Sequence, residues 1–129
     1  MRRYDRKRDF LRIYRYLESE HIPPLGMVFD RDVTWVNDHG FFTYRIEHNN
    51  TQPWLIHFYI EPDKRSYPAA YRMYQHFKGE MKKRGFNSFV ATVPDDKQYL
   101  RNFMKLSGAC VPYARKNDMD FYKIVIKEG

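Results

Sequence analysis

Apolar residues near the start of the chain recur at helical spacing. The spacing i, i+3, i+4, i+7 predicts one apolar stripe, which is formed by Phe10, Ile13, Tyr14 and Leu17. The arginines lie on the opposite side of the helix. We therefore expect a helix over about residues 4–20. It should end at His21-Ile22-Pro23-Pro24, because a residue that precedes proline is disfavoured in the α region.

From Gly26 the period of the pattern changes to two, which is typical of β-strands. Strands are expected at 27–29, 33–36 and 41–46. The next apolar run, WLIHFYI at 54–60, is rich in strand-forming residues. Its alternation places Trp54, Ile56, Phe58 and Ile60 on one face and Leu55, His57 and Tyr59 on the other. Both faces are largely apolar, so this run should be the central strand of a sheet that is covered on both sides.

The second half of the chain alternates helices with strands. A long helix is expected over about 67–84, ended by Gly85, and a shorter helix over about 96–106. Strands are expected at 87–93, 109–115 and 120–127. The last two should form a C-terminal β-hairpin. This order predicts a single mixed-sheet α/β domain over 1–129, in which crossover helices join parallel strands by right-handed connections.

Composition is consistent with one globular domain. Of the 129 residues, 43% are hydrophobic and 18% aromatic, which suffices for a core without disulfides or metals. The single cysteine, Cys110, excludes an intrachain disulfide. The charged start MRRYDRKRDF lacks the apolar region of a signal peptide, and no apolar run approaches the roughly 20 residues of a membrane span. We therefore expect a cytoplasmic protein with no membrane span.

Positive charge is concentrated at the N-terminus. The chain carries a net charge of +7, of which +5 falls within residues 1–15. The cations there are Arg2, Arg3, Arg6, Lys7, Arg8, Arg12 and Arg15. They could contact nucleic acid, an anionic surface or an acidic protein partner. The alternative is a solvated helix face with a positive bias, since no nucleic-acid readout motif accompanies these residues.

The loop after the central strand resembles a known cofactor loop. The stretch reads Ile60-Glu61-Pro62-Asp63-Lys64-Arg65-Ser66-Tyr67-Pro68-Ala69-Ala70, and it is similar in register to the V-x-P-x-x-R-G-x-G-x-G/A loop of the GNAT N-acetyltransferases. Met104-Lys105-Leu106-Ser107-Gly108 also resembles that family's Y-x-K-x-G segment. The segment 98–127 looks like the C-terminal part of a small internal virion protein of short-tailed bacteriophages. The GNAT resemblance covers 54–127 in sequence and 1–53 only in element order.

The GNAT resemblance implies an acyl-CoA N-acyltransferase fold and the transfer of an acetyl group from acetyl-CoA to an amine. Its cofactor-binding positions fall on Ile60, Arg65, Ser66, Tyr67, Ala69 and Ala70. The three glycine positions of the motif fall on Ser66, Pro68 and Ala70. Pro68 removes a backbone donor that would bind the diphosphate, although Arg65 and Lys64 could offset part of that loss by charge. The alternative is structural: Ser66 caps the following helix and Pro68 stiffens its first turn.

The candidate catalytic groups are few. Glu61 ends the central strand, where α/β folds place ligands, and is the candidate general base; otherwise it should pair with a local lysine or arginine. His57 is expected to be a buried, hydrogen-bonded core histidine. Met104 stands at the family's proton-donating tyrosine and has no proton to give, and nearby only Tyr99 carries a hydroxyl. The five histidines have no metal-ligand spacing with one another or with Cys110, so no metal site is expected.

Three hypotheses follow for function. The first is a GNAT-fold protein with a degenerate acetyl-CoA loop that does not catalyse, binds protein partners in an assembly, needs no cofactor, and resides in the host cytoplasm or virion if a phage encodes it. The second is an active N-acetyltransferase that uses acetyl-CoA. The third is a basic nucleic-acid-binding domain that uses the N-terminal helix. The many aromatic residues are consistent with either base stacking or protein contacts.

Overall fold

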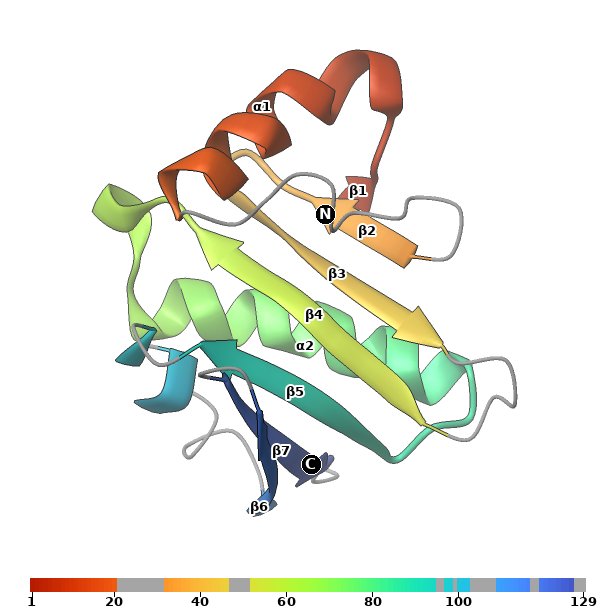
Figure 1. The fold of residues 1–129 in the computed structure, drawn as a ribbon. Coiled ribbons are helices and arrows are strands. Elements are labelled where there is room, and N and C mark those ends of the chain that lie inside the picture. The colour runs from red at the N-terminus through yellow and green to blue at the C-terminus, as the bar shows by residue number, and fades with distance from the viewer. Residues whose placement is uncertain are drawn as a thin grey trace.

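One seven-stranded sheet organises the chain (Figure 1), in the strand order β1-β2-β3-β4-β5-β7-β6. The computed structural model describes residues 1–20, 32–46, 52–94, 97–98, 100–102, 109–116 and 119–126. The strands are β1 Arg2–Arg3, β2 Asp32–Val36, β3 Gly40–Ile46, β4 Pro53–Ile60, β5 Ser88–Pro94, β6 Ala109–Lys116 and β7 Met119–Val125. The helices are α1 Arg6–Ser19, the 3-10 helix η2 Pro62–Lys64, and α2 Tyr67–Lys83.

The connections confirm the mixed α/β prediction. All neighbouring strands pair antiparallel except β4 and β5, which are parallel and are joined through η2 and α2. The C-terminal hairpin is confirmed, with β7 lying between β5 and β6. Residues 98 and 100–102 are helical, within the shorter helix expected over 96–106. The expected strand at 27–29 lies outside the described residues.

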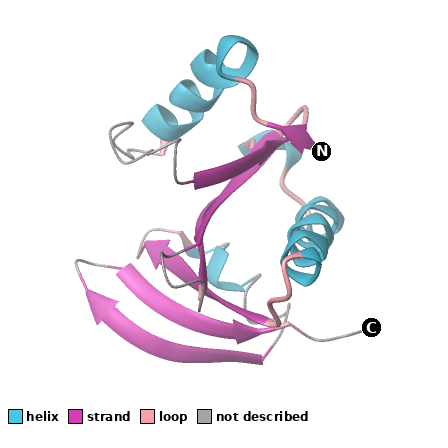
Figure 2. Cartoon of the chain, turned by 90° about the vertical axis from the view of Figure 1, so that its right-hand side faces the viewer, coloured by secondary structure: helices cyan, strands magenta, loops and turns pink. Residues whose placement is uncertain are grey.

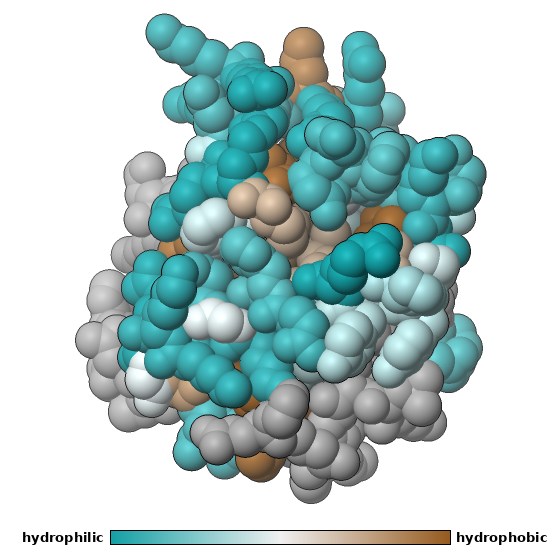
Figure 3. Space-filling view, turned by 180° about the vertical axis from the view of Figure 1, so that it is seen from behind, coloured by the Kyte–Doolittle hydropathy of each residue, from teal (hydrophilic) through white to brown (hydrophobic). Residues whose placement is uncertain are grey.

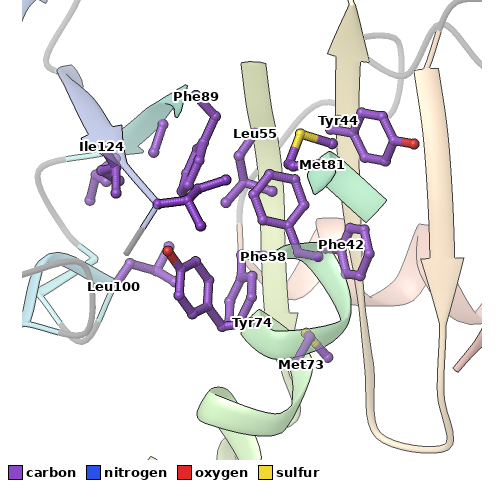
Figure 4. Close-up of a cluster of buried hydrophobic side chains, with 14 of the residues drawn as sticks. Phe42, Tyr44, Leu55, Phe58, Met73, Tyr74, Met81, Phe89, Leu100 and Ile124 are labelled. Atoms are coloured by element: carbon purple, nitrogen blue, oxygen red, sulfur yellow. The ribbon is translucent and has the colours of Figure 1, made fainter. Parts of the chain in front are cut away.

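The two long helices cover opposite faces of the sheet (Figure 2). On the α2 face the core is aromatic, and its rings meet between the helix and the strands (Figure 4). The Phe77 and Phe89 rings, for example, make an edge-to-face contact with centroids 4.8 Å apart. A smaller cluster on the α1 face contains Ile13, Tyr16, Leu17, Val36, Phe41 and Tyr59. The prediction that β4 is central and covered on both sides is confirmed.

Helix α1 is rotated relative to its predicted apolar stripe. Its buried residues are Asp9, Ile13, Tyr16 and Leu17, whereas Phe10 and Tyr14 are 39% and 38% exposed. The cause lies in the two-residue strand β1, which the sequence pattern did not predict. Arg2 of β1 donates to both carboxylate oxygens of Asp9, over 2.7 and 2.6 Å, and this pair lowers the pKa of Asp9. The side-chain pair therefore holds Asp9 inward and turns Phe10 and Tyr14 outward.

The simple alternation predicted for β4 is wrong at one point. Thr43 pairs with His57 but its neighbour Tyr44 pairs with Leu55, so Ile56 is an extra residue in β4. Such a bulge shifts the side-chain alternation by one position. Leu55 therefore joins Phe58 and Ile60 in the α2-face core, instead of lying on the opposite face.

Helix α2 begins and ends as the sequence indicates. The Ser66 side chain accepts a hydrogen bond from the Ala69 amide over 3.2 Å, and Pro68 lies in the first turn. At the other end Gly85 has φ 84°, a conformation that glycine adopts without a steric penalty. Between them the buried Glu80 accepts hydrogen bonds from the Tyr44 hydroxyl (3.0 Å) and the Trp35 indole (3.2 Å), which tie the helix to β2 and β3.

Candidate functional site

Strands β4 and β5 separate towards their carboxyl ends. They pair only at Trp54–Val90 and Leu55–Ala91, close to where both strands begin. The bulge in β4 follows directly, and Figure 1 shows the two arrows diverging beyond it. Parallel strands that diverge next to a helix N-terminus form the place where α/β folds bind ligands. The candidate site is therefore the loop from Glu61 to Ser66, the start of α2 and the ends of β4 and β5.

The loop uses most of its own backbone donors. The Lys64 amide donates to the Glu61 carbonyl (2.8 Å) and the Arg65 amide to the Pro62 carbonyl (3.4 Å), closing η2. The Glu61 amide donates to the His39 carbonyl over 2.8 Å.

In the first turn of α2 the Ala69 amide is capped by the Ser66 hydroxyl, and Pro68 has no amide hydrogen. The Ala70 amide donates to the Ser66 carbonyl over 3.0 Å, as the helix requires. The structural interpretation of Ser66 and Pro68 is confirmed. Among the first three residues of α2, only Tyr67 has an amide that is neither removed by proline nor capped by Ser66. The first turn of α2 therefore offers fewer backbone amides to an anion than a glycine-rich loop would.

Arg65 points back into the protein. Its Nε donates to the Ile60 carbonyl over 2.8 Å, and its Nη2 to Oε1 of Glu20 over 2.7 Å. The guanidinium also lies 5.5 Å from the centre of the Tyr59 ring. The second carboxylate oxygen of Glu20 is bound by Lys97, which follows β5. The arginine that the motif offers to a phosphate is thus paired with a carboxylate of this chain.

Glu61 lies between a tyrosine and a histidine. The predicted pairing of Glu61 with a local lysine or arginine is wrong. Its Oε1 accepts a hydrogen bond from the Tyr16 hydroxyl over 2.6 Å, and its Oε2 is 3.6 Å from Nδ1 of His39. Burial, and then the bond to Glu61, raise the pKa of Tyr16. The carboxylate of the half-buried Glu61 thus lies between the Tyr16 hydroxyl and the exposed His39 ring. Tyr16 retains its proton and holds the carboxylate in place.

His57 lies beside this site, on the α1 face of β4. Its ring is 6.0 Å from the Phe41 ring, and burial lowers the pKa of His57 to about 4. The imidazole is therefore neutral at pH 7, but His57 is half-buried and belongs to neither hydrophobic cluster, so the prediction of a buried core histidine is wrong. Met104 and Tyr99, the other sequence candidates for proton transfer, lie outside the described residues.

The structure divides the seven N-terminal cations into two groups. Arg2 binds Asp9, Arg3 lies 5.6 Å from the Trp35 ring, and Arg12 donates to the Asp38 carbonyl over 3.3 Å. Arg3 is exposed as well, and the remaining exposed cations, Arg6, Lys7, Arg8 and Arg15, pair with no carboxylate of the described residues. These four lie on α1 and leave the N-terminal cations as a candidate surface for an anionic partner.

Sequence reasoning missed Glu20, Lys97, Tyr16 and His39. Glu20 meets Arg65 and Lys97 across 45 and 77 positions, and Tyr16 meets Glu61 across 45 positions. No local spacing carries such a signal. Within the described residues, no cluster of His, Cys, Asp and Glu is suited to a metal ion, and neither helix is long and apolar enough to cross a membrane.

Comparison with solved structures decides the fold. Ard1 from Thermoplasma volcanium superimposes with a TM-score of 0.79 and 15% identity, over 98% of this chain and 97% of that one. A putative GNAT-family acetyltransferase from Desulfovibrio desulfuricans gives a TM-score of 0.74 and 15% identity, with 98% of each chain covered. This chain has the GNAT fold. The fold class predicted from the sequence is therefore confirmed.

A third similar structure holds a ligand. It is the PaiA N-acetyltransferase from Thermoplasma acidophilum in complex with coenzyme A, with a TM-score of 0.63 and 12% identity. The alignment covers 84% of this chain and 65% of that one. No protein-family model and no curated protein sequence matches this chain. The resemblance to phage virion proteins therefore stays a prediction.

Proposed function

We propose that this GNAT-fold chain acts by binding a protein partner and does not transfer acetyl groups. The observation that carries the proposal is the state of the acetyl-CoA loop. Pro68 lacks an amide hydrogen, Ser66 caps Ala69, and Arg65 is bound to Ile60 and Glu20. A hydrogen bond to a charged group contributes about 1.5–3 kcal/mol. Losing one such bond weakens the binding of a diphosphate by roughly 10- to 150-fold, and this loop lacks more than one such bond.

The partner surface is the outward side of α1. We define the α1 outer face as Arg6, Lys7, Arg8, Phe10, Leu11, Tyr14 and Arg15. Leu11 is 66% exposed, and the Phe10 and Tyr14 rings lie 6.1 Å apart beside it. Figure 3 shows a hydrophobic side chain standing among hydrophilic ones at the top of the molecule, where α1 lies. An apolar strip bordered by cations suits a partner that is acidic around an apolar centre.

The placement of the cations supports a binding role over a stabilising one. Arg6, Lys7 and Arg8 are the first three residues of α1, where the helix dipole is positive and acidic residues stabilise. Three cations there reduce helix stability, and no ion pair with a described residue compensates. Leu11 lies among them, which favours a protein partner over nucleic acid, since nucleic-acid grooves are read by cations and by flat rings.

Acetyl transfer is the second candidate. It is favoured by the position of Glu61, held by Tyr16 at the end of β4 and accompanied by the exposed His39. In that role Glu61 would accept the proton of the amine.

Titration with acetyl-CoA tests the proposal. We expect no heat in calorimetry and no rise in Tm at millimolar acetyl-CoA. A ligand present at 100 times its Kd would stabilise the protein by about 2.7 kcal/mol. The Thermoplasma acidophilum enzyme, whose structure holds coenzyme A, is the positive control. A Tm increase in this chain that saturates below millimolar acetyl-CoA would overturn the proposal in favour of the transferase.

A further inference from the structure

We infer that the outward side of α2 binds single-stranded nucleic acid, with unpaired bases on a tyrosine pair and phosphates on neighbouring cations. We define the α2 outer face as Tyr67, Tyr71, Arg72, Gln75, Gly79 and Lys82. The inference goes beyond the proposed function, because α1 and α2 cover opposite faces of the sheet and this surface is separate from the α1 outer face. Figure 3 views the molecule from the side that α2 covers, where hydrophilic colours prevail.

Two exposed tyrosines lie next to each other on this face. Tyr67 is 53% and Tyr71 is 42% exposed, and their rings are 6.0 Å apart with an angle of 20° between the ring planes. They are one helical turn apart, so both rings lie on the same side of α2. Every base has a flat π-face, so nearly parallel rings on a surface suit the stacking of successive unpaired bases. In a duplex these base faces are already stacked, and the expected ligand is therefore a single strand.

The charge of the α2 outer face is positive. Arg72 and Lys82 are exposed and pair with no carboxylate in the part of the chain that the structure describes. Glu80, the one acidic residue of α2, is buried and accepts hydrogen bonds from Trp35 and Tyr44. No carboxylate of α2 therefore lies on its outer face. Exposed cations without internal partners bind the phosphates of nucleic acids with little regard to sequence.

Gly79 leaves the outer face open between the tyrosine pair and Lys82. A Cβ on Gly79 would meet nothing within 4 Å, so packing within the chain does not require a glycine at this position. A glycine inside a helix is destabilising relative to alanine, but it allows another backbone to approach closely. A strand that follows α2 from the tyrosines to Lys82 passes over this position.

The length of the surface fits several nucleotides. One row of residues follows α2 at intervals of four positions, namely Tyr67, Tyr71, Gln75 and Gly79. Lys82 lies at the far end of this row. With a rise of about 1.5 Å per residue, the row is roughly 22 Å long. Surfaces that combine rings with cations hold roughly 4–16 nucleotides.

The two helices present different surfaces to solvent. The α1 outer face carries Leu11, whereas the exposed large hydrophobic residues described in α2 are both tyrosines. A protein partner gains most of its affinity from a few buried anchors, while rings and cations suffice for unpaired bases. The α2 outer face therefore favours nucleic acid over a second protein partner.

The Tyr71→Ala variant tests the inference with labelled oligouridine and oligothymidine of about 12 nucleotides as probes. We expect Tyr71→Ala to weaken binding by about 5- to 150-fold in fluorescence anisotropy at low salt, because a stacked base loses its ring. The matched control is Tyr14→Ala, which removes an exposed helical tyrosine from the α1 outer face and should bind as the wild type does. Binding of either oligonucleotide supports the inference, and the tighter one identifies the strand as RNA or DNA.

Two further variants separate a binding site from a general charge effect. Lys82→Gln removes one phosphate contact, so the slope of log affinity against log salt should become shallower by about 0.7. Lys123→Gln makes the same charge change at an exposed position of β7 and should leave the slope unchanged. Gly79→Leu changes no charge but fills the open position, so it should weaken binding severalfold without lowering Tm.

Two results would overturn the inference. One is the absence of binding of either oligonucleotide at low salt. The other is a loss of affinity in Tyr14→Ala that equals or exceeds the loss in Tyr71→Ala. Both are independent of the acetyl-CoA titration, which tests the proposed function.

Discussion

Arg2 holds Asp9 through two parallel hydrogen bonds, Nη1 to Oδ2 at 2.7 Å and Nη2 to Oδ1 at 2.6 Å. The Asp9 side chain is 2% exposed and also accepts the Asp5 amide at 2.8 Å. A two-residue strand at the sheet edge thereby sets the rotation of the first helix. Because the rotation decides which residues face solvent, this ion pair helps to leave Phe10, Leu11 and Tyr14 exposed on the outer side of α1.

We predict that Asp9→Asn lowers the free energy of unfolding by about 1–3 kcal/mol, because a buried acceptor that serves a charged donor and a backbone amide is weakened. Chemical denaturation measures the effect. Glu18→Gln on the exposed side of α1 is the control and should change stability by less than about 0.5 kcal/mol. Equal stability of Asp9→Asn and the wild type would show that the pair does not hold the helix.

Two glycines should respond to alanine with opposite signs. A Cβ on Gly40 would lie 2.0 Å from the carbonyl oxygen of Tyr59, so Gly40→Ala must displace β4 and should destabilise the protein by about 2–4 kcal/mol. A Cβ on Gly79, inside α2, meets nothing within 4 Å. Gly79→Ala should therefore stabilise by about 0.5–1 kcal/mol. Thermal unfolding compares the two, and a stabilising Gly40→Ala would contradict the close β3–β4 contact.

Stability should fall with acid because of His57. Its pKa is about 4 in the fold and 6.5 in the unfolded chain, since burial disfavours the cation, with Asp32 raising and Arg45 lowering the pKa. As pH falls below 6.5, the unfolded chain binds the proton first, so stability is full above pH 6.5 and declines towards pH 4. Between pH 7 and 5 the loss should be about 2 kcal/mol. Urea unfolding of His57→Gln should show a shallower decline over this interval, and an unchanged slope would refute the assignment.

The α1 outer face should bind an acidic amphipathic peptide with a leucine stripe. Leu11→Ser should weaken this binding severalfold without changing stability, because Leu11 is 66% exposed. Val125→Ser, which changes an exposed apolar residue of β7, is the control. Fluorescence anisotropy of the labelled peptide measures both. If a single-stranded oligonucleotide binds more tightly than the peptide and Leu11→Ser has no effect, the surface is a nucleic-acid site instead.

The sequence pattern predicts the sheet and its helices because most elements bury one continuous face. It fails where a single distant contact outweighs periodicity. In α1, Asp9 lies inside because Arg2 neutralises it, and no apolar pattern contains that information. In β4, the extra Ile56 shifts the alternation, and a bulge leaves no mark on a run in which both faces are apolar.

The candidate site is less predictable than the fold. The loop register, the Ser66 cap and the effect of Pro68 follow from local chemistry and can be read along the chain. The partners of Arg65 and Glu61 cannot, because Glu20 and Tyr16 come from a helix 45 positions earlier. A motif match identifies the residues of a loop. Only the structure shows which of their side chains are already paired with residues of another segment.

The position of β7 has a consequence for biosynthesis. This strand, Met119–Val125, is an interior strand bonded to β5 on one side and β6 on the other, although both precede it in the chain. During translation β5 and β6 therefore emerge from the ribosome with their shared neighbour still missing. The β5 and β6 edges can therefore pair with β7 only after Met119–Val125 has been synthesised, so this half of the sheet cannot be completed before then.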